Sequence, residues 1–272
     1  MIRMCVISSP RRHGPCKCLL LLVVSAERHT VPDQSLSGEI RVLCRKTVDA
    51  TFDIRGIVEP SIRAAADSSA ASSRGTHVNF GLLESFRNSD RNEFSYSELY
   101  RRHLDLAVEA EELGYDTIWL TEHHFVEDGY SPAMMPLGAA IATRTKKIRI
   151  GTFVLLMPLH HPLHVAEQAV TLDVLSNGRF DLGLGQGYRP QEFEGFNISR
   201  AERASRLREG VEIIRRVLSE DNVSYEGKHF TVRNVTLYPK PVQKPVPIWI
   251  GARARTATER AARNGYHLAG TA

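Results

Sequence analysis

From Val78 onward, short apolar runs alternate with longer segments in which apolar residues recur every three or four positions. The short runs are typical of buried strands, and the longer spacing is typical of helices that pack one face against a core. The pattern predicts strands at 79–83, 117–121, 148–156, 179–184, 246–250 and 267–271. It predicts helices at 97–113, from 131, from 162 to about 178, from 199 and at 256–264, and an irregular strand pair over 225–237.

The order of these elements indicates an α/β fold. Strands that are apolar throughout and alternate with amphipathic helices predict a parallel sheet covered by helices, either doubly wound or closed as a (β/α)8 TIM-type barrel. The glycines at 183, 185 and 187 are spaced G-x-G-x-G and Tyr188 follows, so the G-x-G-x-x-G dinucleotide fingerprint of the doubly wound fold is not met. This argues against the usual doubly wound arrangement. About six of the eight strand–helix units of a barrel are present, so we expect either a barrel that is cut short at its C-terminus or a sheet that stays open.

Residues 1–77 lack a sustained period, and we expect them to form a leader outside the folded body, which spans 78–272. This leader is expected to be disordered, or to result from translation that starts upstream of an authentic start at Val78. An alternative is a secretory signal, because Arg11, Arg12 and Lys17 precede the apolar run at 19–24.

The charge and the cysteines are confined to this leader. Residues 1–77 hold eleven basic and seven acidic side chains, which account for the whole +4 net charge, whereas 78–272 hold twenty-four of each. All four cysteines also lie upstream of Val78. The body is therefore neutral and free of thiols, which argues against nucleic-acid or membrane binding and excludes a zinc finger or disulfide scaffold there.

Candidate chemistry lies where the predicted strands end, because barrel enzymes place their active sites at that face. Glu122-His123-His124 follows the second strand and indicates a proton-handling role. Gly183, Gly185 and Gly187 at the fourth strand point toward the barrel interior, where missing side chains would leave a flat vacancy for a ligand. A bulge or a sharp strand exit explains these glycines equally well.

The fifth strand ends at Gly251, and Arg253 and Arg255 precede a capping box from Thr256 to Glu259. Free amides at a helix start next to guanidinium groups predict a phosphate site, although plain capping is the simpler interpretation. Three further histidines could suggest a metal centre: His160, His161 and His164. Because Pro162 separates them at a helix start, we do not expect them to form a ligand set.

Several short motifs, in this order, resemble the bacterial luciferase-like flavin monooxygenases. They are 114–120 (GYDTIWL), 122–125 (EHHF), 150–152 (IGT), 161–162 (HP), 176–180 (SNGRF), 183–187 (GLGQG) and 247–250 (PIWI). The resemblance runs from about Asn79 to the last residue. It implies a cytoplasmic (β/α)8 flavoprotein, a homodimer or heterodimer, that uses reduced FMN and O₂ to oxygenate a small organic substrate through a flavin hydroperoxide. A separate NAD(P)H-dependent flavin reductase would supply the cofactor.

The resemblance also implies site residues. It assigns His123 as the catalytic acid/base group and Phe153-Val154 as the pair that packs on the flavin, often through a cis peptide. Flavin and phosphate contacts would fall on Gly185, Gln186, Gly187, Tyr188, Gly251, Arg253, Ala254, Thr256 and Ala257. Relatives often have Arg in place of Gln186 and polar residues in place of Ala254 and Ala257, so arginines and amides nearby would have to compensate.

Three alternatives stay open. A deazaflavin, coenzyme F420, could replace FMN on the same fold and transfer hydride without O₂. A metal-dependent hydrolase is the interpretation suggested by five histidines between His123 and His164. The chain could also be an inactive truncated fragment. The substrate pocket is expected to be apolar, lined by Phe125, Phe153, Leu156 and Tyr188.

Overall fold

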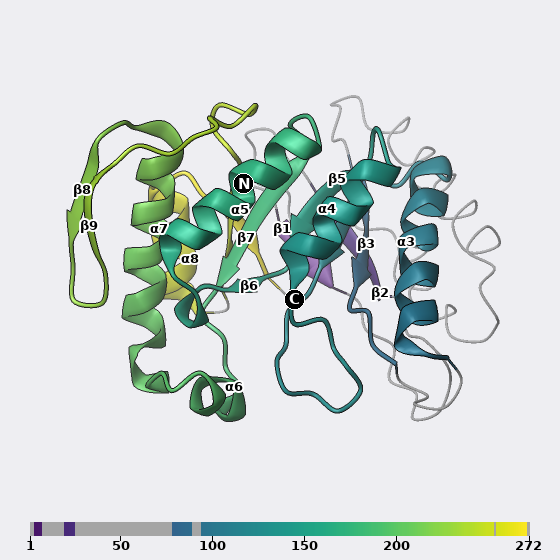
Figure 1. Cartoon of the computed structure of the whole chain (residues 1–272), viewed down its shortest axis with the longest axis horizontal. Coiled ribbons are helices and arrows are strands. Elements are labelled where there is room, and N and C mark those ends of the chain that lie inside the picture. The colour runs from purple at the N-terminus through teal and green to yellow at the C-terminus, as the bar shows by residue number, and fades with distance from the viewer. Residues whose placement is uncertain (1–2, 7–18, 25–77, 89–93, 253, 271–272) are drawn as a thin grey trace.

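A computed structural model describes residues 3–6, 19–24, 78–88, 94–252 and 254–270 (Figure 1). The strands of the main sheet from Val78 onward are β3 (Val78–Glu84), β4 (Thr117–Leu120), β5 (Arg149–Thr152), β6 (Leu155–Leu156), β7 (Phe180–Gly185), β10 (Ile248–Gly251) and β11 (His267–Ala269). The helices are α3 (Tyr96–Glu112), α4 (Met134–Arg144), α5 (Pro162–Leu175), α6 (Pro190–Gly195), α7 (Arg203–Ser219) and α8 (Arg255–Arg263). An antiparallel pair, β8 (Val223–Glu226) and β9 (Thr231–Val235), lies outside this sheet.

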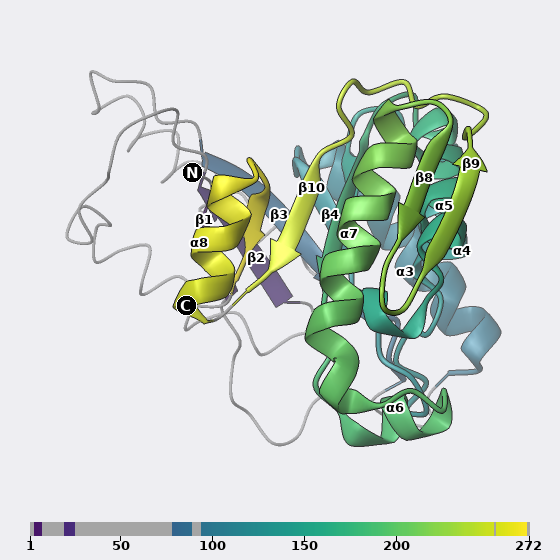
Figure 2. The ribbon, with the colours of Figure 1, turned by 90° about the vertical axis from the view of Figure 1, so that its left-hand side faces the viewer.

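The six strands β3, β4, β5, β7, β10 and β11 lie side by side in that order and are all parallel. They form a curled half-barrel with helices on its outer face, as Figures 1 and 2 show from two sides. The prediction of a (β/α) barrel with about six of its eight units is therefore confirmed.

The outer face of the sheet explains the helical periodicity of the sequence. Alternate residues of the central strands point outward and meet the apolar faces of the helices, and all are buried. Representative members of this core are Ile118, Ile150 and Leu182 from the strands and Leu106, Ile141, Leu172 and Ile214 from the helices.

The inner face is filled by aromatic rings. Trp119 and Trp249 meet edge to face with their centroids 5.2 Å apart, and both are buried. A Cβ atom on Gly81 would lie 2.8 Å from the Trp119 ring, and one on Gly151 would collide with it, so these glycines make room for the indole. The barrel interior is thus a packed core at this level, as expected for the fold.

The predicted strand at 148–156 is interrupted. It divides into β5 and β6 around Phe153-Val154, whose peptide bond is cis, as the family resemblance led us to expect. Both halves pair with β7. At the break, the Thr152 hydroxyl donates to the Gly183 carbonyl over 2.7 Å and accepts from the Gly183 amide over 2.8 Å. The Thr152 side chain therefore supplies the hydrogen bonds between β5 and β7 at the point where the backbone ladder is interrupted.

Two helix starts differ from the predictions. The second helix begins at Met134, three residues after the Ser131 expected to cap it. The helix predicted from Ser199 begins at Arg203, because Ser199 makes no capping bond and a short 3₁₀ turn (Arg200–Glu202) precedes it. The pattern also failed to predict α6, which is too short to show a period.

Two segments of the predicted leader join the sheet. Strands β1 (Arg3–Val6) and β2 (Leu19–Val24) pair antiparallel with each other, and β2 pairs antiparallel with β3. The rest of 1–77 lies outside the described residues, so the proposal that this segment is a leader stays a prediction.

The Thr152 contact can be tested by Gly183→Ala. The added Cβ would collide with the Thr152 carbonyl oxygen, which is backbone and cannot move aside. We expect a loss of at least about 1–3 kcal/mol in the free energy of unfolding, measured by urea denaturation. Gly270→Ala is the matched control, because its Cβ would meet the nearest atom at an ordinary 3.4 Å. Equal stability of the two variants would show that β5 and β7 are not held this closely.

Candidate active site

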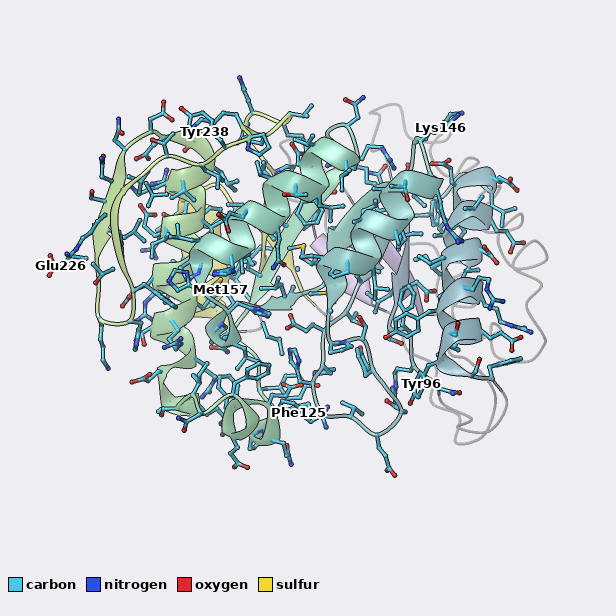
Figure 3. The ribbon with its side chains drawn as sticks, in the orientation of Figure 1. Tyr96, Phe125, Lys146, Met157, Glu226 and Tyr238 are labelled. Atoms are coloured by element: carbon cyan, nitrogen blue, oxygen red, sulfur yellow. The ribbon has the colours of Figure 1, made fainter. Side chains whose placement is uncertain are left out.

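The carboxyl ends of the parallel strands lie at one end of the molecule. The segment after β4 and the helix α6 meet there, and Figure 3 shows Phe125 beside α6 at this end. Strand direction alone brings these segments together, because all six strands of the half-barrel are parallel. The residues predicted from the ends of strands β4 and β7 therefore belong to one surface.

His123 is held from both ring nitrogens. Its Nδ1 atom lies 2.7 Å from Glu192 Oε1, and its Nε2 atom lies 3.3 Å from the Tyr188 hydroxyl. Tyr130 packs edge-on against the imidazole at 4.7 Å between centroids. The His123 side chain is 15% exposed, so it is oriented by the protein yet open to a ligand. Such a histidine is suited to moving a proton at Nε2.

Glu192 is a site residue that the sequence did not reveal. It comes from α6, is fully buried, and also accepts the His124 backbone amide over 3.1 Å. Sixty-nine positions separate it from His123, and the helix that carries it is six residues long. One available signal was Pro190, which stands at the first helical position two residues before Glu192.

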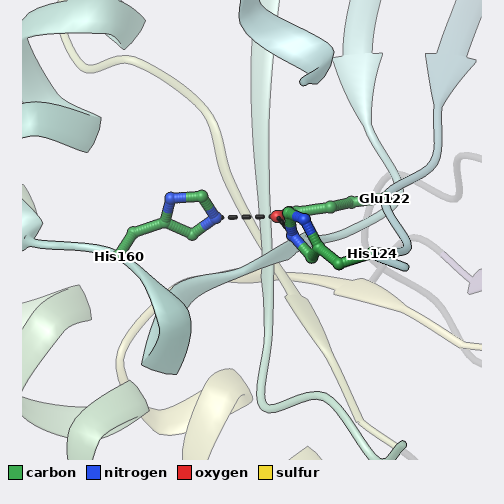
Figure 4. A group of neighbouring side chains, drawn as sticks. All are labelled: Glu122, His124 and His160. Atoms are coloured by element: carbon green, nitrogen blue, oxygen red, sulfur yellow. Dashed lines mark hydrogen bonds and ion pairs between the residues drawn. The ribbon is translucent and has the colours of Figure 1, made fainter. Parts of the chain in front are cut away.

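The neighbouring His124 points into a different cluster, drawn in Figure 4. His124 Nε2 and His160 Nε2 lie 2.6 and 2.7 Å from the same oxygen, Glu122 Oε1. The other oxygen of Glu122 accepts the Leu156 amide over 2.7 Å. Burial alone would raise the pKa of Glu122, but the hydrogen bonds from both imidazoles and this amide outweigh burial and lower the pKa to about 2. Through these hydrogen bonds, Glu122 links the end of β4 to β6 and to the segment that follows β6.

The same three side chains are the kind that bind metals, and their ligand atoms lie within 4.8 Å of one another. Two ligands of one tetrahedral zinc ion lie about 3.3 Å apart. The 2.6 and 2.7 Å separations here are those of hydrogen-bond partners. His161 and His164 contact each other instead, with centroids 5.8 Å apart. The metal-hydrolase alternative stays a prediction, which elemental analysis of the purified protein would test.

Of the two interpretations of the glycines of β7, the vacancy for a flat ligand is not found at two positions. The space next to Gly183 holds the Thr152 carbonyl, and that next to Gly185 holds a Val154 methyl group. Val154 also lies 3.2 Å from a Cβ placed on Gly251. The glycines therefore allow close approach of the chain itself. This packing brings together three predicted cofactor residues: Val154, Gly185 and Gly251.

The predicted phosphate segment begins α8. Arg253 lies outside the described residues. Ala254 is the N-cap residue, Ala257 donates its amide to the Ala254 carbonyl, and Thr256 is exposed. The capping box predicted from Thr256 to Glu259 is wrong, since the helix already begins at Arg255, whose side chain bonds Glu259. With alanine as N-cap, no side chain caps the first turn of this helix.

The four residues expected to line an apolar pocket are not gathered. Leu156 packs beneath α6 with Phe193, and Phe153 packs edge-on against Trp119 in the barrel interior. Phe125 and Tyr188 are 65% and 69% exposed. Gln186 is also exposed, and Gly187 has φ +70°, a left-handed conformation that favours glycine and ends the strand.

Comparisons with known proteins agree with this fold. The model of the luciferase-like monooxygenase family matches residues 78–272. The chain is 38% identical over 171 residues to an F420-dependent glucose-6-phosphate dehydrogenase of Microbacterium testaceum, covering 60% of this chain and 51% of that protein. It is 31% identical over 174 residues to the oxygenase component of a flavin-dependent trigonelline monooxygenase of Acinetobacter baylyi, covering 63% and 48%.

Among solved structures, the monooxygenase RslO1 from Streptomyces bottropensis superposes with a TM-score of 0.65 and 36% identity, covering 68% of this chain and 58% of that one. The fold is the (β/α) barrel of luciferase-like proteins. The chain belongs to the luciferase-like monooxygenase family, which includes FMN-dependent monooxygenases and F420-dependent dehydrogenases. It spans about half the length of the curated relatives that it matches.

Among its described residues, no helix has the length and apolar character needed to cross a membrane.

The Glu122 cluster makes a prediction about acid stability. The pKa of Glu122 is lowered from 4.5 to about 2, so its stabilising contribution is complete above about pH 4.5 and is lost as the pH falls toward 2. Glu122→Gln should lower the free energy of unfolding at pH 7, and the gap to wild type should narrow over that interval. Denaturant melts at several pH values measure this gap. The exposed Glu167→Gln is the control; a gap for Glu122→Gln that is constant with pH would contradict the account.

Proposed function

We propose that the protein is a flavin-dependent monooxygenase that uses reduced FMN and O₂ to oxygenate a small organic substrate. The observation that carries the proposal is the placement of His123. Its Nε2 atom faces the Tyr188 hydroxyl at the same end of the half-barrel as the Phe153-Val154 peptide. This is the arrangement expected where a proton must be delivered beside a bound flavin.

The residues present suit a flat, anionic cofactor. The first turn of α8 has no side-chain cap, so the amides of Arg255 and Thr256, unlike that of Ala257, are available to a phosphate group, and the Arg255 side chain is 90% exposed beside them. Gly251, Val154 and Gly185 lie next to one another at the ends of their strands. We infer that these residues, with Phe153, Gln186, Gly187, Tyr188, Arg253, Ala254, Thr256 and Ala257, hold FMN. When bound, reduced FMN supplies the electrons that activate O₂.

The protein residues would then manage the proton and exclude water. His123 gives or takes a proton at Nε2, and the Tyr188 hydroxyl extends this path by 3.3 Å toward solvent. Phe153 and Val154 belong to the apolar cluster inside the barrel and would present a dry surface to the flavin ring. These roles require that His123 keeps a fixed orientation.

The proposed reaction needs further components. A separate NAD(P)H-dependent flavin reductase would supply reduced FMN. The trigonelline relative is named as the oxygenase component of its monooxygenase, which is consistent with such a division between two proteins. We propose that the enzyme acts in the cytoplasm as a homodimer or heterodimer, on a small molecule rather than on nucleic acid or a membrane.

Coenzyme F420 is the second candidate cofactor. It is favoured by the 38% identity to an F420-dependent dehydrogenase, which exceeds the identity to the trigonelline monooxygenase. In that case His123 would serve a hydride transfer without O₂, and the same phosphate segment would bind the deazaflavin.

Intrinsic fluorescence can separate the two cofactors. The chain has two tryptophans, Trp119 and Trp249, and both lie in the barrel interior. We expect anaerobic titration with reduced FMN to quench their emission in a saturable manner, at concentrations where F420 has a smaller effect. Saturable quenching by F420 alone would favour the dehydrogenase. No quenching by either cofactor would contradict both proposals.

His123→Ala should slow the reoxidation of bound reduced FMN by O₂, because the variant lacks the ring nitrogen that would exchange a proton with the bound cofactor. General acid–base groups contribute about 10²–10⁴-fold to rate. Stopped-flow absorbance measures this rate, and fluorescence titration measures cofactor affinity, which should change much less. His164→Ala is the matched control, since His164 is exposed and lies on α5. Equal losses of rate and affinity in His123→Ala would indicate that His123 is only structural.

A further inference from the structure

We propose that Glu192 is the positioning residue of this site: it keeps the proton of neutral His123 on Nδ1 and stabilises the imidazolium that forms when Nε2 takes up a second proton. The effect on turnover rests on the proposed function, whereas the effect on the His123 ring does not.

The geometry fixes which atoms interact. Glu192 Oε1 lies 2.7 Å from His123 Nδ1 and accepts the His124 amide over 3.1 Å. Because the amide can only donate, it holds Oε1 in place as an acceptor. The imidazole must then donate from Nδ1, which leaves the Nε2 lone pair facing the Tyr188 hydroxyl. A buried carboxylate behind an imidazole serves this purpose in several unrelated enzymes.

The charge around Glu192 favours a protonated partner. Its side chain is fully buried, and its Oε2 atom has no hydrogen-bond partner among the described residues. Among the described lysines and arginines, the nearest to this carboxylate is Arg189, whose Nη1 atom lies 3.9 Å from Oε1, beyond hydrogen-bond reach. A buried carboxylate with so little compensation is stabilised when the imidazole in contact with it becomes cationic. The imidazole of His123, at 2.7 Å, is therefore the partner that lies nearest to the Glu192 carboxylate among the described contacts.

The fold makes this contact rigid. Pro190 begins α6, and Phe193, the residue after Glu192, is buried against Leu156 and Leu159. Glu194 on the same helix is exposed. The helix therefore presents one carboxylate inward to His123 and a second carboxylate to solvent, which provides a matched pair for experiment.

The first test reads the tautomer in the wild-type protein and needs a variant only to assign the signal. The ¹⁵N shifts of its imidazoles distinguish the two neutral tautomers, and His123→Gln identifies the signal. We expect neutral His123 to carry its proton on Nδ1. A proton mainly on Nε2 would overturn the proposal. This measurement needs neither cofactor nor substrate, so it stands even if the protein proves not to be a monooxygenase.

The second test compares Glu192→Gln with Glu194→Gln. Glutamine keeps an oxygen for the His124 amide but removes the charge. We expect Glu192→Gln to slow reoxidation of bound reduced FMN by about 10–100-fold, by analogy with the loss of a carboxylate that orients a metal-bound histidine. Its affinity for reduced FMN should stay within about twofold of wild type. Glu194→Gln should match wild type in both. Equal rates for the two variants, or a parallel loss of affinity, would overturn the proposal.

Discussion

The close contact between Thr152 and Gly183 is the constraint on which the site depends. Strand β5 ends at Thr152, and its hydroxyl makes both hydrogen bonds to Gly183 that a strand backbone would otherwise supply. Only a residue without a Cβ atom permits the Thr152 carbonyl to lie so near. The chain can then leave the ladder at Phe153-Val154 and rejoin β7 at Leu155. Val154 is thereby placed against Gly185 and Gly251.

The two adjacent histidines that follow β4, His123 and His124, contact different carboxylates. His124 turns toward Glu122 and His160, in a cluster that ties the strand end to the segment after β6. His123 turns toward α6 and Tyr188. One carboxylate therefore stabilises the strand end, while the other contacts the partly exposed His123. Two acidic residues that lie far apart in the sequence, Glu122 and Glu192, therefore hold the two adjacent histidines.

The sequence predicted the architecture well because parallel strands and covering helices leave a strong apolar pattern. It also singled out His123 as a candidate, whose role stays a prediction, and the family resemblance led us to expect the cis peptide found at Phe153-Val154. It did not reveal Glu192, since a contact across 69 positions leaves no local signal. The glycines of β7 were ambiguous for a similar reason: a missing side chain shows that something approaches closely, but not whether that is a ligand or, as here, Thr152 and Val154.

The central claim is that reduced flavin binds at the carboxyl ends of the strands, with its ring beside Phe153-Val154 and within reach of His123. A crystal structure of the protein with reduced FMN, prepared without oxygen, tests this most directly. The account predicts density for the ring against that peptide and for the phosphate at the first turn of α8. Flavin bound elsewhere, or with its ring remote from His123, would contradict it.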